Sequence, residues 1–380
     1  MNERAVFVTS SNACLGRRGK PKGGVQLCSN EYLAALRHAG FDIAILDFEV
    51  DTRLINRILK RLHRRPYKNS IPPGLENKVF EAISSSGAKV VFLNLADLAP
   101  LAKPIRKRFG KDVKIILLSH GLGCADILHD IRVRCLESEN ATASSRDLCW
   151  LAGHLIAECE QRTYIEHVFC LSEFDAGLER WVGARSVSWV PRIVTANPLP
   201  WSPVAGRVGF VGTLDHGPNK EGLELFLRAL EKQQGKEIKV RVIGGPEHSG
   251  LAFAKSHPNV EYLGHLKDDQ LASDAATWMC AIHPLFCYAR GCSTKLAVLL
   301  GWQIPIVTTP QGCRGYLWKD GRIPQAKNPD DFVKIVSRAQ NLPQAATMRA
   351  EIVKIVESSP SEADVTALMR EQMQYLHHME

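Results

Sequence analysis

The chain has 380 residues, of which 45% are hydrophobic and 23% are charged, a composition that excludes disordered and fibrous proteins and indicates a folded globular one. Because this length exceeds what one hydrophobic core usually serves, we expect two domains. The formal net charge of +8 favours anionic partners, such as nucleotides, phospholipids or nucleic acids.

We expect neither a targeting segment nor a metal site. Residues 1–4 lead directly into a short apolar stretch, too early for the core of a signal peptide, and no apolar run reaches the roughly 18 residues of a membrane-spanning helix. The 11 cysteines form no CxxC pair and mostly lie in apolar stretches. The prediction is a cytoplasmic protein, with peripheral attachment to the inner face of the membrane as an alternative.

Short runs rich in Val, Ile and Leu alternate with stretches of helical periodicity in the first half of the chain. Parallel strands buried between helices have this pattern, because both of their faces are covered. The predicted strands are residues 5–9, 42–46, 90–93, 114–119 and 168–172, and the predicted helices are residues 30–39 and 151–164.

A glycine-rich stretch, GKPKGGVQ at residues 19–26, follows the first predicted strand. Backbone N–H groups in such a loop can approach a phosphate at a helix N-terminus, which makes Gly23 and Gly24 candidate phosphate contacts. A tight turn that needs glycine only for its backbone would have the same pattern. The stretch has neither a GxGxxG fingerprint nor a Walker lysine, which argues against a dinucleotide enzyme or a P-loop ATPase.

Residues 53–68, RLINRILKRLHRRPYK, combine a basic surface with an apolar stripe at helical spacing. Lipid headgroups or a phosphate-bearing acceptor would suit these charges, whereas a core helix with a solvated basic face would look the same. Aromatic residues for base stacking are not interleaved, so a nucleic-acid acceptor is disfavoured without being excluded. The candidate contacts for an acceptor or a membrane are Arg57, Lys60, Arg61, Arg64 and Arg65.

Prolines interrupt the pattern at residues 191–205, which we predict to be a linker or hinge. The alternation of strands and helices then resumes, with predicted strands at residues 208–212, 239–243, 260–263, 279–283 and 306–308. Two doubly wound α/β halves joined in this way predict a ligand cleft between them, at the carboxyl ends of the strands.

Six motifs of the second half follow one another in the order found in the GT-B glycosyltransferases, in particular the large retaining family 4 group. They are GFVGTLDHGPNKEG at residues 209–222, VRVIGG at 240–245, VEYLGHL at 260–266, HPL at 283–285, GCSTKL at 291–296 and PIVTTPQGCRG at 305–315. The chain resembles this family well over about residues 206–318 and more loosely over residues 5–50 and 115–185.

The resemblance implies an α/β protein with two Rossmann-like domains that face each other across a cleft. An acceptor-side domain would occupy residues 1–190, the linker 191–205 and a donor-binding domain 206–350, with a C-terminal helical segment, 351–380, packing back on the first domain. The implied reaction transfers a sugar from a nucleoside diphosphate donor, UDP or GDP, with retention of configuration and with neither a metal nor a cofactor.

The resemblance also implies a phosphate site at a strand end and a helix start in the second half. Cations and small residues at a helix start attract anions, and fixed cations can stabilise a departing nucleoside diphosphate without a metal. An ordinary solvated basic turn is the alternative. The candidate residues are Gly212, Thr213, Arg290, Gly291, Ser293, Thr294 and Lys295.

Two positions depart from the family pattern, because Val298 and Arg290 stand where the family has glutamates. The family's downstream carboxylate is expected to accept hydrogen bonds from the nucleotide ribose, and the upstream one to lie near the donor sugar. A degenerate, non-catalytic protein is one interpretation. We favour a shifted donor preference or different ribose contacts.

His120 ends a predicted strand directly before Gly121 and resembles the family histidine that closes on the donor sugar. A lone histidine at a strand end can also be a structural hydrogen-bonding group, but we predict that His120 serves sugar transfer. A sugar-nucleotide epimerase of the same fold and a non-catalytic sugar-nucleotide or glycan-binding protein stay open as alternatives. The sequence names neither the sugar, the base nor the acceptor.

Overall fold

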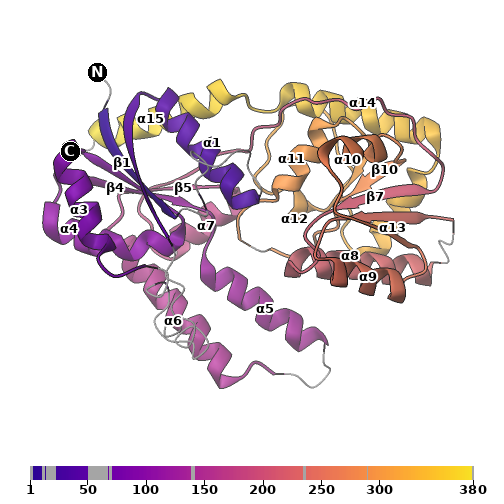
Figure 1. Ribbon diagram of the computed structural model, residues 1–380, viewed down its shortest axis with the longest axis horizontal. Helices are drawn as coiled ribbons and strands as arrows, with labels where there is room; N and C mark the ends of the chain where they lie inside the picture. Colours follow the sequence, from indigo (N-terminus) through magenta and orange to yellow (C-terminus); the bar gives the residue numbers. More distant parts are fainter. Residues whose placement is uncertain are drawn as a thin grey trace. The chain divides into compact units, whose positions relative to one another are not determined.

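The chain folds into two compact units, which we describe from a computed structural model (Figure 1). The structure describes residues 3–10, 13, 23–49, 67, 71–137, 142–233, 237–288 and 290–378. Unit 1 comprises Met1–Pro191, Ala289–Cys292 and Glu362–Glu380, and unit 2 comprises Arg192–Tyr288 and Ser293–Ser361. Within the described residues, no helix has the length and apolarity needed to cross a membrane.

Unit 1 is built on a six-stranded parallel sheet with the strand order β2-β1-β3-β4-β5-β6. The first strand pairs in parallel with both the second and the third, so the chain winds in both directions from it. The strands are β1 (Glu3–Ser10), β2 (Phe41–Phe48), β3 (Val90–Asn94), β4 (Lys114–Ser119), β5 (His167–Cys170) and β6 (Val187–Trp189).

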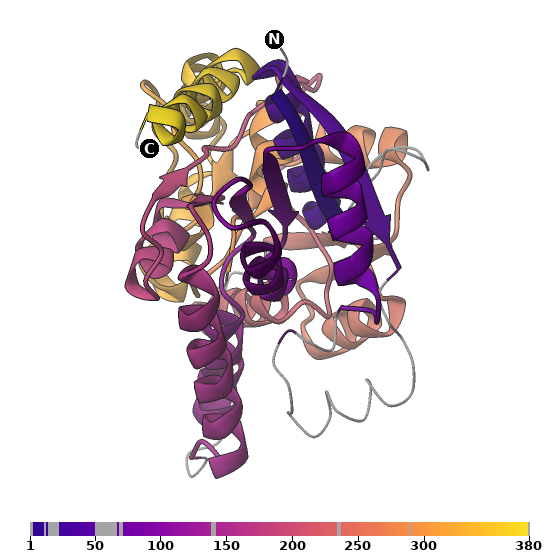
Figure 2. The same cartoon turned by 90° about the vertical axis from the view of Figure 1, so that its left-hand side faces the viewer.

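Helices cover both faces of this sheet, as Figure 2 shows. The last helix lies against the first, where the guanidinium of Arg370 donates to the backbone carbonyls of His38 and Ala39. The helical elements are α1 (Gly24–His38), α3 (Leu75–Ser86), the 3-10 helix η2 (Ala96–Leu101), α4 (Ala102–Phe109), α5 (Gly123–Glu137), α6 (Ser145–Arg162), α7 (Glu173–Trp181) and α15 (Glu362–His378).

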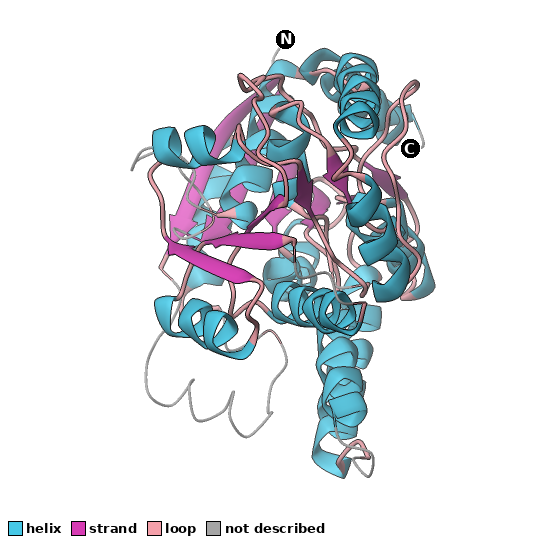
Figure 3. Ribbon diagram, turned by 90° about the vertical axis from the view of Figure 1, so that its right-hand side faces the viewer, coloured by secondary structure: helices cyan, strands magenta, loops and turns pink. Residues whose placement is uncertain are grey.

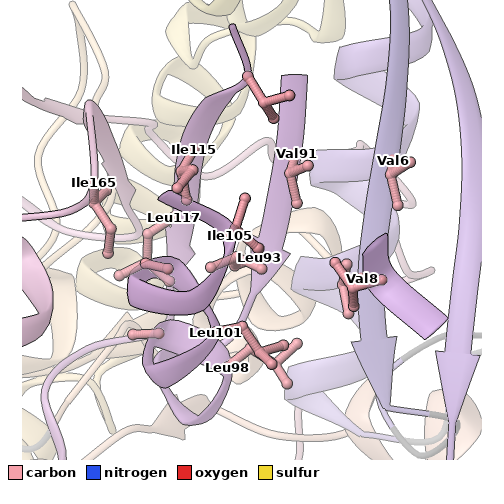
Figure 4. Close-up of a cluster of buried hydrophobic side chains, with 14 of the residues drawn as sticks. Val6, Val8, Val91, Leu93, Leu98, Leu101, Ile105, Ile115, Leu117 and Ile165 are labelled. Carbon is pink, nitrogen blue, oxygen red and sulfur yellow. The ribbon is translucent and has the colours of Figure 1, made fainter. Parts of the chain in front are cut away.

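The core of unit 1 lies between the sheet and the segment η2–α4 (Figure 4). Every residue of β3 and β4 is buried, because parallel strands covered on both faces expose neither side. The strands contribute Val6, Val8, Val91, Leu93, Ile115 and Leu117, and the covering segments contribute Leu98, Leu101, Ile105 and Ile165.

Unit 2 is built on a five-stranded parallel sheet with the order β11-β10-β7-β8-β9, and helices lie on both of its faces (Figure 3). The strands are β7 (Arg207–Val211), β8 (Lys239–Ile243), β9 (Val260–Gly264), β10 (Cys280–Ile282) and β11 (Ile306–Val307). The helices are α8 (Gly217–Lys232), α9 (Glu247–Ser256), α10 (Asp268–Ala275), α11 (Thr294–Gly301), α12 (Pro310–Cys313), α13 (Pro329–Arg338) and α14 (Leu342–Ser358).

The two parallel-sheet, Rossmann-like domains confirm the predicted fold class. Three predicted boundaries were wrong because of helix caps. The helices predicted at 30–39 and 151–164 begin earlier, after Gly23 and after Ser144, whose hydroxyl accepts from the Asp147 N–H. The strand predicted at 168–172 ends at Cys170, because Ser172 instead caps α7.

The proline-rich residues 192–205 and the segment 290–292 are grouped differently from the predicted domain ranges. Residues 192–205 lie on unit 2, where the Asn197 and Leu199 N–H groups donate to the carbonyls of Gly301 and Trp302. Residues 290–292 interrupt the sequence of unit 2 but belong to unit 1. The basic candidates Arg57, Lys60, Arg61, Arg64 and Arg65 lie outside the described residues.

Candidate functional site

In unit 2, Lys295 lies close to the backbone at the end of β7. A Cβ atom on Gly212, which follows β7, would lie 2.7 Å from the Lys295 Nζ atom, so only glycine lets the amine approach this turn. The Nζ atom also lies 5.9 Å from the centre of the Phe210 ring. Lys295 is the second residue of α11, and the N-terminus of a helix attracts anions. The structure thus brings two predicted phosphate contacts together.

The Lys295 amine is partly buried and has no carboxylate beside it within the part of the chain that the structure describes. Burial lowers the pKa of this lysine to about 7, because the charged form loses its hydration and no anion replaces it. A phosphate arriving at this position would supply the missing negative charge.

This lowered pKa predicts that binding of a diphosphate ligand weakens as the pH rises above 7. The free protein must then take up a proton on Lys295 before the amine can pair with the diphosphate, so the affinity should fall by about tenfold per pH unit. The neighbouring His283 does not titrate in this range, because its pKa is about 3. Calorimetry between pH 6 and 8.5 measures the slope, and Lys295→Met should remove it. An equal slope in both proteins would contradict the assignment.

His283 connects three segments at the same end of the sheet. It follows β10, and its ring nitrogens lie 3.0 Å from the Thr308 hydroxyl, which follows β11, and 2.8 Å from the Ser293 hydroxyl, which precedes α11. Burial, with the charges of Lys295 and Arg314, lowers the pKa of His283 to about 3. The neutral ring therefore fixes the start of α11 relative to two strands without adding a charge.

Two further residues complete this corner of unit 2. A Cβ atom on Gly312 would lie 2.4 Å from the Thr308 hydroxyl and 2.7 Å from His283 Nδ1. The backbone at Gly312 therefore packs directly against these two hydrogen-bonded side chains. Arg314 is 4% exposed and donates to the Gln311 carbonyl at 2.7 Å. Neither His283 nor Arg314 was among the predicted site residues, although both lie in motifs that carry the resemblance.

In unit 1, His120 follows β4 and is held by Asn94 at the end of β3. The Asn94 amide donates to the hydroxyls of Thr9 at 3.0 Å and Ser29 at 2.9 Å, and Ser29 in turn donates to the Val25 carbonyl. The Asn94 carbonyl oxygen is therefore the acceptor that faces His120 Nε2, 3.2 Å away. Because this oxygen can only accept, Nε2 carries a proton and donates it.

The turn that contains His120 is anchored by a buried ion pair. The Ser119 hydroxyl donates to Glu179 at 2.7 Å and accepts from the Gly121 N–H at 3.1 Å. Arg162 donates to both carboxylate oxygens of Glu179, at 2.6 and 2.9 Å, and both side chains are fully buried. One side of the turn is thus fixed by charge-assisted hydrogen bonds.

A second buried carboxylate, Glu158 of α6, fixes the other side of the turn. It accepts from the backbone N–H groups of Gly123 at 2.8 Å and Cys124 at 3.2 Å, which begin α5, and from the Tyr67 hydroxyl. Burial and the charge of Glu158 raise the pKa of the Tyr67 hydroxyl and of the Cys124 thiol, so both stay protonated. An acidic group at a helix N-terminus also complements the helix dipole.

The segment with Arg290 and Gly291 lies beside His120. Asp126 of α5 accepts from the Arg290 backbone N–H at 3.1 Å and pairs with its guanidinium at 2.7 Å. Asp175 accepts from the Gly291 N–H at 3.2 Å, and a Cβ atom on Gly291 would lie 3.0 Å from the His120 carbonyl oxygen. Because Arg290 belongs to unit 1, its cooperation with a phosphate site in unit 2 stays a prediction.

The other predicted contacts lie at helix starts and turns. Gly23 caps α1 and Gly24 is its first residue, and both are exposed. Thr213 precedes α8, and its backbone carbonyl accepts from the side-chain amide of Asn219 on that helix at 2.8 Å. Thr294 is the first residue of α11. Val298 lies on the same helix and is 48% exposed, and its side chain offers no hydrogen-bond acceptor to a ribose.

Comparisons with known proteins agree on one kind of fold. Residues 205–341 match the family model described as Glycosyl transferases group 1. A search of curated protein sequences gives no match. Among solved structures, the chain is similar to the sucrose-phosphate synthase of Thermosynechococcus elongatus, with a TM-score of 0.68 and 13% identity over 100% of both chains.

Two more solved structures are similar over nearly the whole chain. HepE of Anabaena, in complex with UDP and glucose, has a TM-score of 0.64 and 12% identity over 98% of this chain and 100% of that one. The lipopolysaccharide outer core galactosyltransferase WaaB, in its apo form, has a TM-score of 0.61 and 13% identity over 98% of this chain and 99% of that one.

Proposed function

We propose that this protein is a glycosyltransferase, because it has the GT-B fold and its residues 205–341 match the family model of the glycosyl transferases group 1, and that it uses a nucleoside diphosphate sugar as its donor. The observation that carries the proposal is the Lys295 amine, which lies beside Gly212 without a carboxylate partner in the described residues. UDP is the first nucleotide to test, because the similar HepE structure contains it.

The proposed reaction retains the configuration at the transferred sugar and needs no bound metal. As the bond to the sugar breaks, negative charge develops on the leaving diphosphate, and a fixed cation at a helix start stabilises that charge. Lys295 supplies the cation, and the neutral His283 holds Ser293 and Thr308 around it. His120 is proposed to serve the sugar rather than the nucleotide.

Assay of a panel of UDP- and GDP-sugars tests this function directly. Release of the nucleoside diphosphate together with a glycosylated acceptor is the expected result. An isomerised donor would instead indicate an epimerase, and binding without turnover a sugar-nucleotide-binding protein. A thermal-shift screen of the same compounds identifies the base first, since a ligand that binds the native state raises its apparent stability.

Lys295→Ala should weaken the binding of both the nucleoside diphosphate and the donor sugar by about 1.5–3 kcal/mol, the range for a hydrogen bond to a charged group. Calorimetry with UDP measures the change at pH 6.5, where the wild-type amine is mostly protonated. Lys334→Ala removes an equal charge from the exposed surface of α13 and serves as the matched control. Unchanged affinity in Lys295→Ala would place the phosphates elsewhere.

The acceptor side of the proposal concerns the basic residues Arg57, Lys60, Arg61, Arg64 and Arg65. If they contact an anionic membrane, the wild-type protein should sediment with anionic liposomes at low salt and be released at high salt, because ions screen exposed charges beyond roughly 8 Å at physiological ionic strength. Replacing the five by glutamine should abolish sedimentation. Failure of the wild type to bind at low salt would exclude membrane docking and leave a soluble acceptor or a solvated basic face.

A further inference from the structure

Ser293 stands at the N-cap of α11, yet its side chain does not cap the helix. Serine is one of the residues that most often accept a hydrogen bond from the first turn of a helix at this position. Five other helices have the usual arrangement, in which the N-cap side chain accepts from the N–H group three residues later. Their N-cap residues are Ser144, Ser172, Thr309, Asn328 and Asn341. The Ser293 hydroxyl is directed elsewhere.

The backbone at Ser293 does not prevent capping. Its φ and ψ angles are −81° and 110°, close to the −85° and 116° of Asn341, whose side-chain oxygen accepts from the Gln344 N–H at 3.2 Å. The difference lies in the partner of the side chain, because the Ser293 hydroxyl lies 2.8 Å from His283 Nε2. His283 thus holds the hydroxyl away from the helix.

The His283 ring can hold this hydroxyl because Nε2 is an acceptor. The Thr308 hydroxyl donates to the backbone carbonyl of His283 at 3.2 Å, so its oxygen accepts from Nδ1, 3.0 Å away. Burial lowers the pKa of His283 to about 3, so the ring is neutral and carries one proton, on Nδ1. Ser293 therefore donates its hydroxyl hydrogen to Nε2.

The first N–H groups of α11 are left open by this arrangement. The N–H groups of the first turn of an α-helix have no acceptor within the helix. The Tyr316 hydroxyl accepts from the Ala297 N–H at 2.8 Å. Among the contacts of the described residues, the N–H groups of residues 294–296 have no acceptor. These open groups lie on the same turn as Lys295, whose amine has no carboxylate beside it in that part of the chain.

We propose that His283 is a positioning residue of the donor site, which keeps the Ser293 hydroxyl from capping α11 so that the first N–H groups of the helix can bind a phosphate. This inference rests on the proposed function, in which Lys295 and the start of α11 hold the diphosphate. Without His283, the hydroxyl and the phosphate would compete for the same N–H groups. With it, the positive end of the helix dipole is reserved for the ligand.

Two neutral replacements of His283 test the proposal by calorimetry with UDP and with inorganic pyrophosphate at pH 6.5. His283→Gln can place its amide oxygen at the position of Nε2, so it should hold the hydroxyl and keep the affinity of the wild type. His283→Asn is too short to reach Ser293 and should release the hydroxyl. Its affinity should fall by about fivefold, the equivalent of the roughly 1 kcal/mol that an N-cap hydrogen bond contributes.

The Ser293→Ala background separates this role from simple packing. His283→Asn should have no further effect on affinity there, because no hydroxyl is left to compete. An equal loss with and without the Ser293 hydroxyl would overturn the proposal. Ser293→Asn gives a second test in which His283 is unchanged, since asparagine caps α14 from nearly the same backbone conformation. It should also weaken binding, and unchanged affinity would contradict the competition.

Amide hydrogen exchange without ligand distinguishes this inference from the proposed function. The Leu296 N–H should exchange more slowly in His283→Asn than in the wild type, because the released hydroxyl accepts from it, and the Ser293→Ala/His283→Asn double variant should lose this protection. Equal exchange in the wild type and His283→Asn would overturn the role of His283, even if the wild type binds UDP. A wild-type protein that binds neither UDP nor pyrophosphate would overturn the proposed function and the role of the open N–H groups with it.

Discussion

Replacement of Arg162 by methionine is expected to lower the free energy of unfolding of unit 1 by about 3–5 kcal/mol. The guanidinium is fully buried and donates to both carboxylate oxygens of Glu179. Methionine has a similar length but leaves the Glu179 carboxylate charged, buried and without its cation. Most of the loss therefore comes from the unpaired carboxylate, which has neither water nor a counter-charge.

Urea unfolding followed by hydrogen exchange measures this free energy for the peptides of unit 1 separately from those of unit 2. The double variant Arg162→Met/Glu179→Leu should recover most of the loss, because it removes the stranded charge together with its partner. Arg228→Met, which breaks an exposed pair with Glu224 on α8, should cost at most about 0.5 kcal/mol. A loss below about 1 kcal/mol in Arg162→Met would mean that the buried pair is not what fixes this region.

His120→Ala is expected to lower turnover by about 100-fold, the lower end for a positioned polar group, with much less effect on donor affinity. Two features give this expectation. The Asn94 carbonyl oxygen accepts from the Nε2–H, which holds the ring in one orientation. The turn on both sides of His120 is anchored by Glu179 and Glu158, so truncation of the ring should leave the backbone in place.

Steady-state turnover and calorimetric donor affinity separate the two effects. His38→Ala is the control, because His38 is an exposed histidine of the same unit that pairs only with the exposed Glu362 among the described contacts; its turnover should equal that of the wild type. If His120→Ala turns over normally with a genuine acceptor, His120 is a structural residue. A large loss of donor affinity with unchanged turnover would move it to the nucleotide.

The sheets could be predicted because parallel strands that are covered on both faces have nearly continuous runs of apolar residues. Each β3 and β4 residue is buried and most of them are apolar, so the runs could be recognised without knowledge of their neighbours. The fold class followed from these runs and their spacing. The short edge strand β6, Val187–Trp189, was missed because none of its residues is fully buried.

The polar interior was much less predictable. Glu158 and Arg162 are four residues apart on α6, a spacing that in a sequence indicates an exposed i, i+4 arrangement on a solvated helix face. They are instead buried, because their partners come from other segments: Glu179 from α7, and the N–H groups of Gly123 and Cys124 from α5. Hydrogen bonds between segments far apart in the sequence produce no periodic pattern of residues from which they could be predicted.

The same limit applies to the candidate site. Lys295 and Gly212 could be predicted from motifs, whereas Asn94 gave no signal, because its role depends on hydroxyls from β1 and α1 and on a ring after β4. Arg290 was predicted because it is close to Lys295 in sequence, yet these two residues, five positions apart, belong to unit 1 and unit 2 respectively. Proximity along the chain did not predict the unit to which the side chain belongs.

The docking of α15 on α1 affects the order in which the protein can be made. Arg370 bonds to carbonyls more than 330 positions earlier in the chain, and every residue of unit 2 is synthesised between the two partners. The ribosome therefore releases a complete unit 2 before unit 1 can acquire its last helix. Until then, the surface of α1 that α15 covers is open to other contacts, and exposed surface of this kind makes a folding intermediate prone to aggregation.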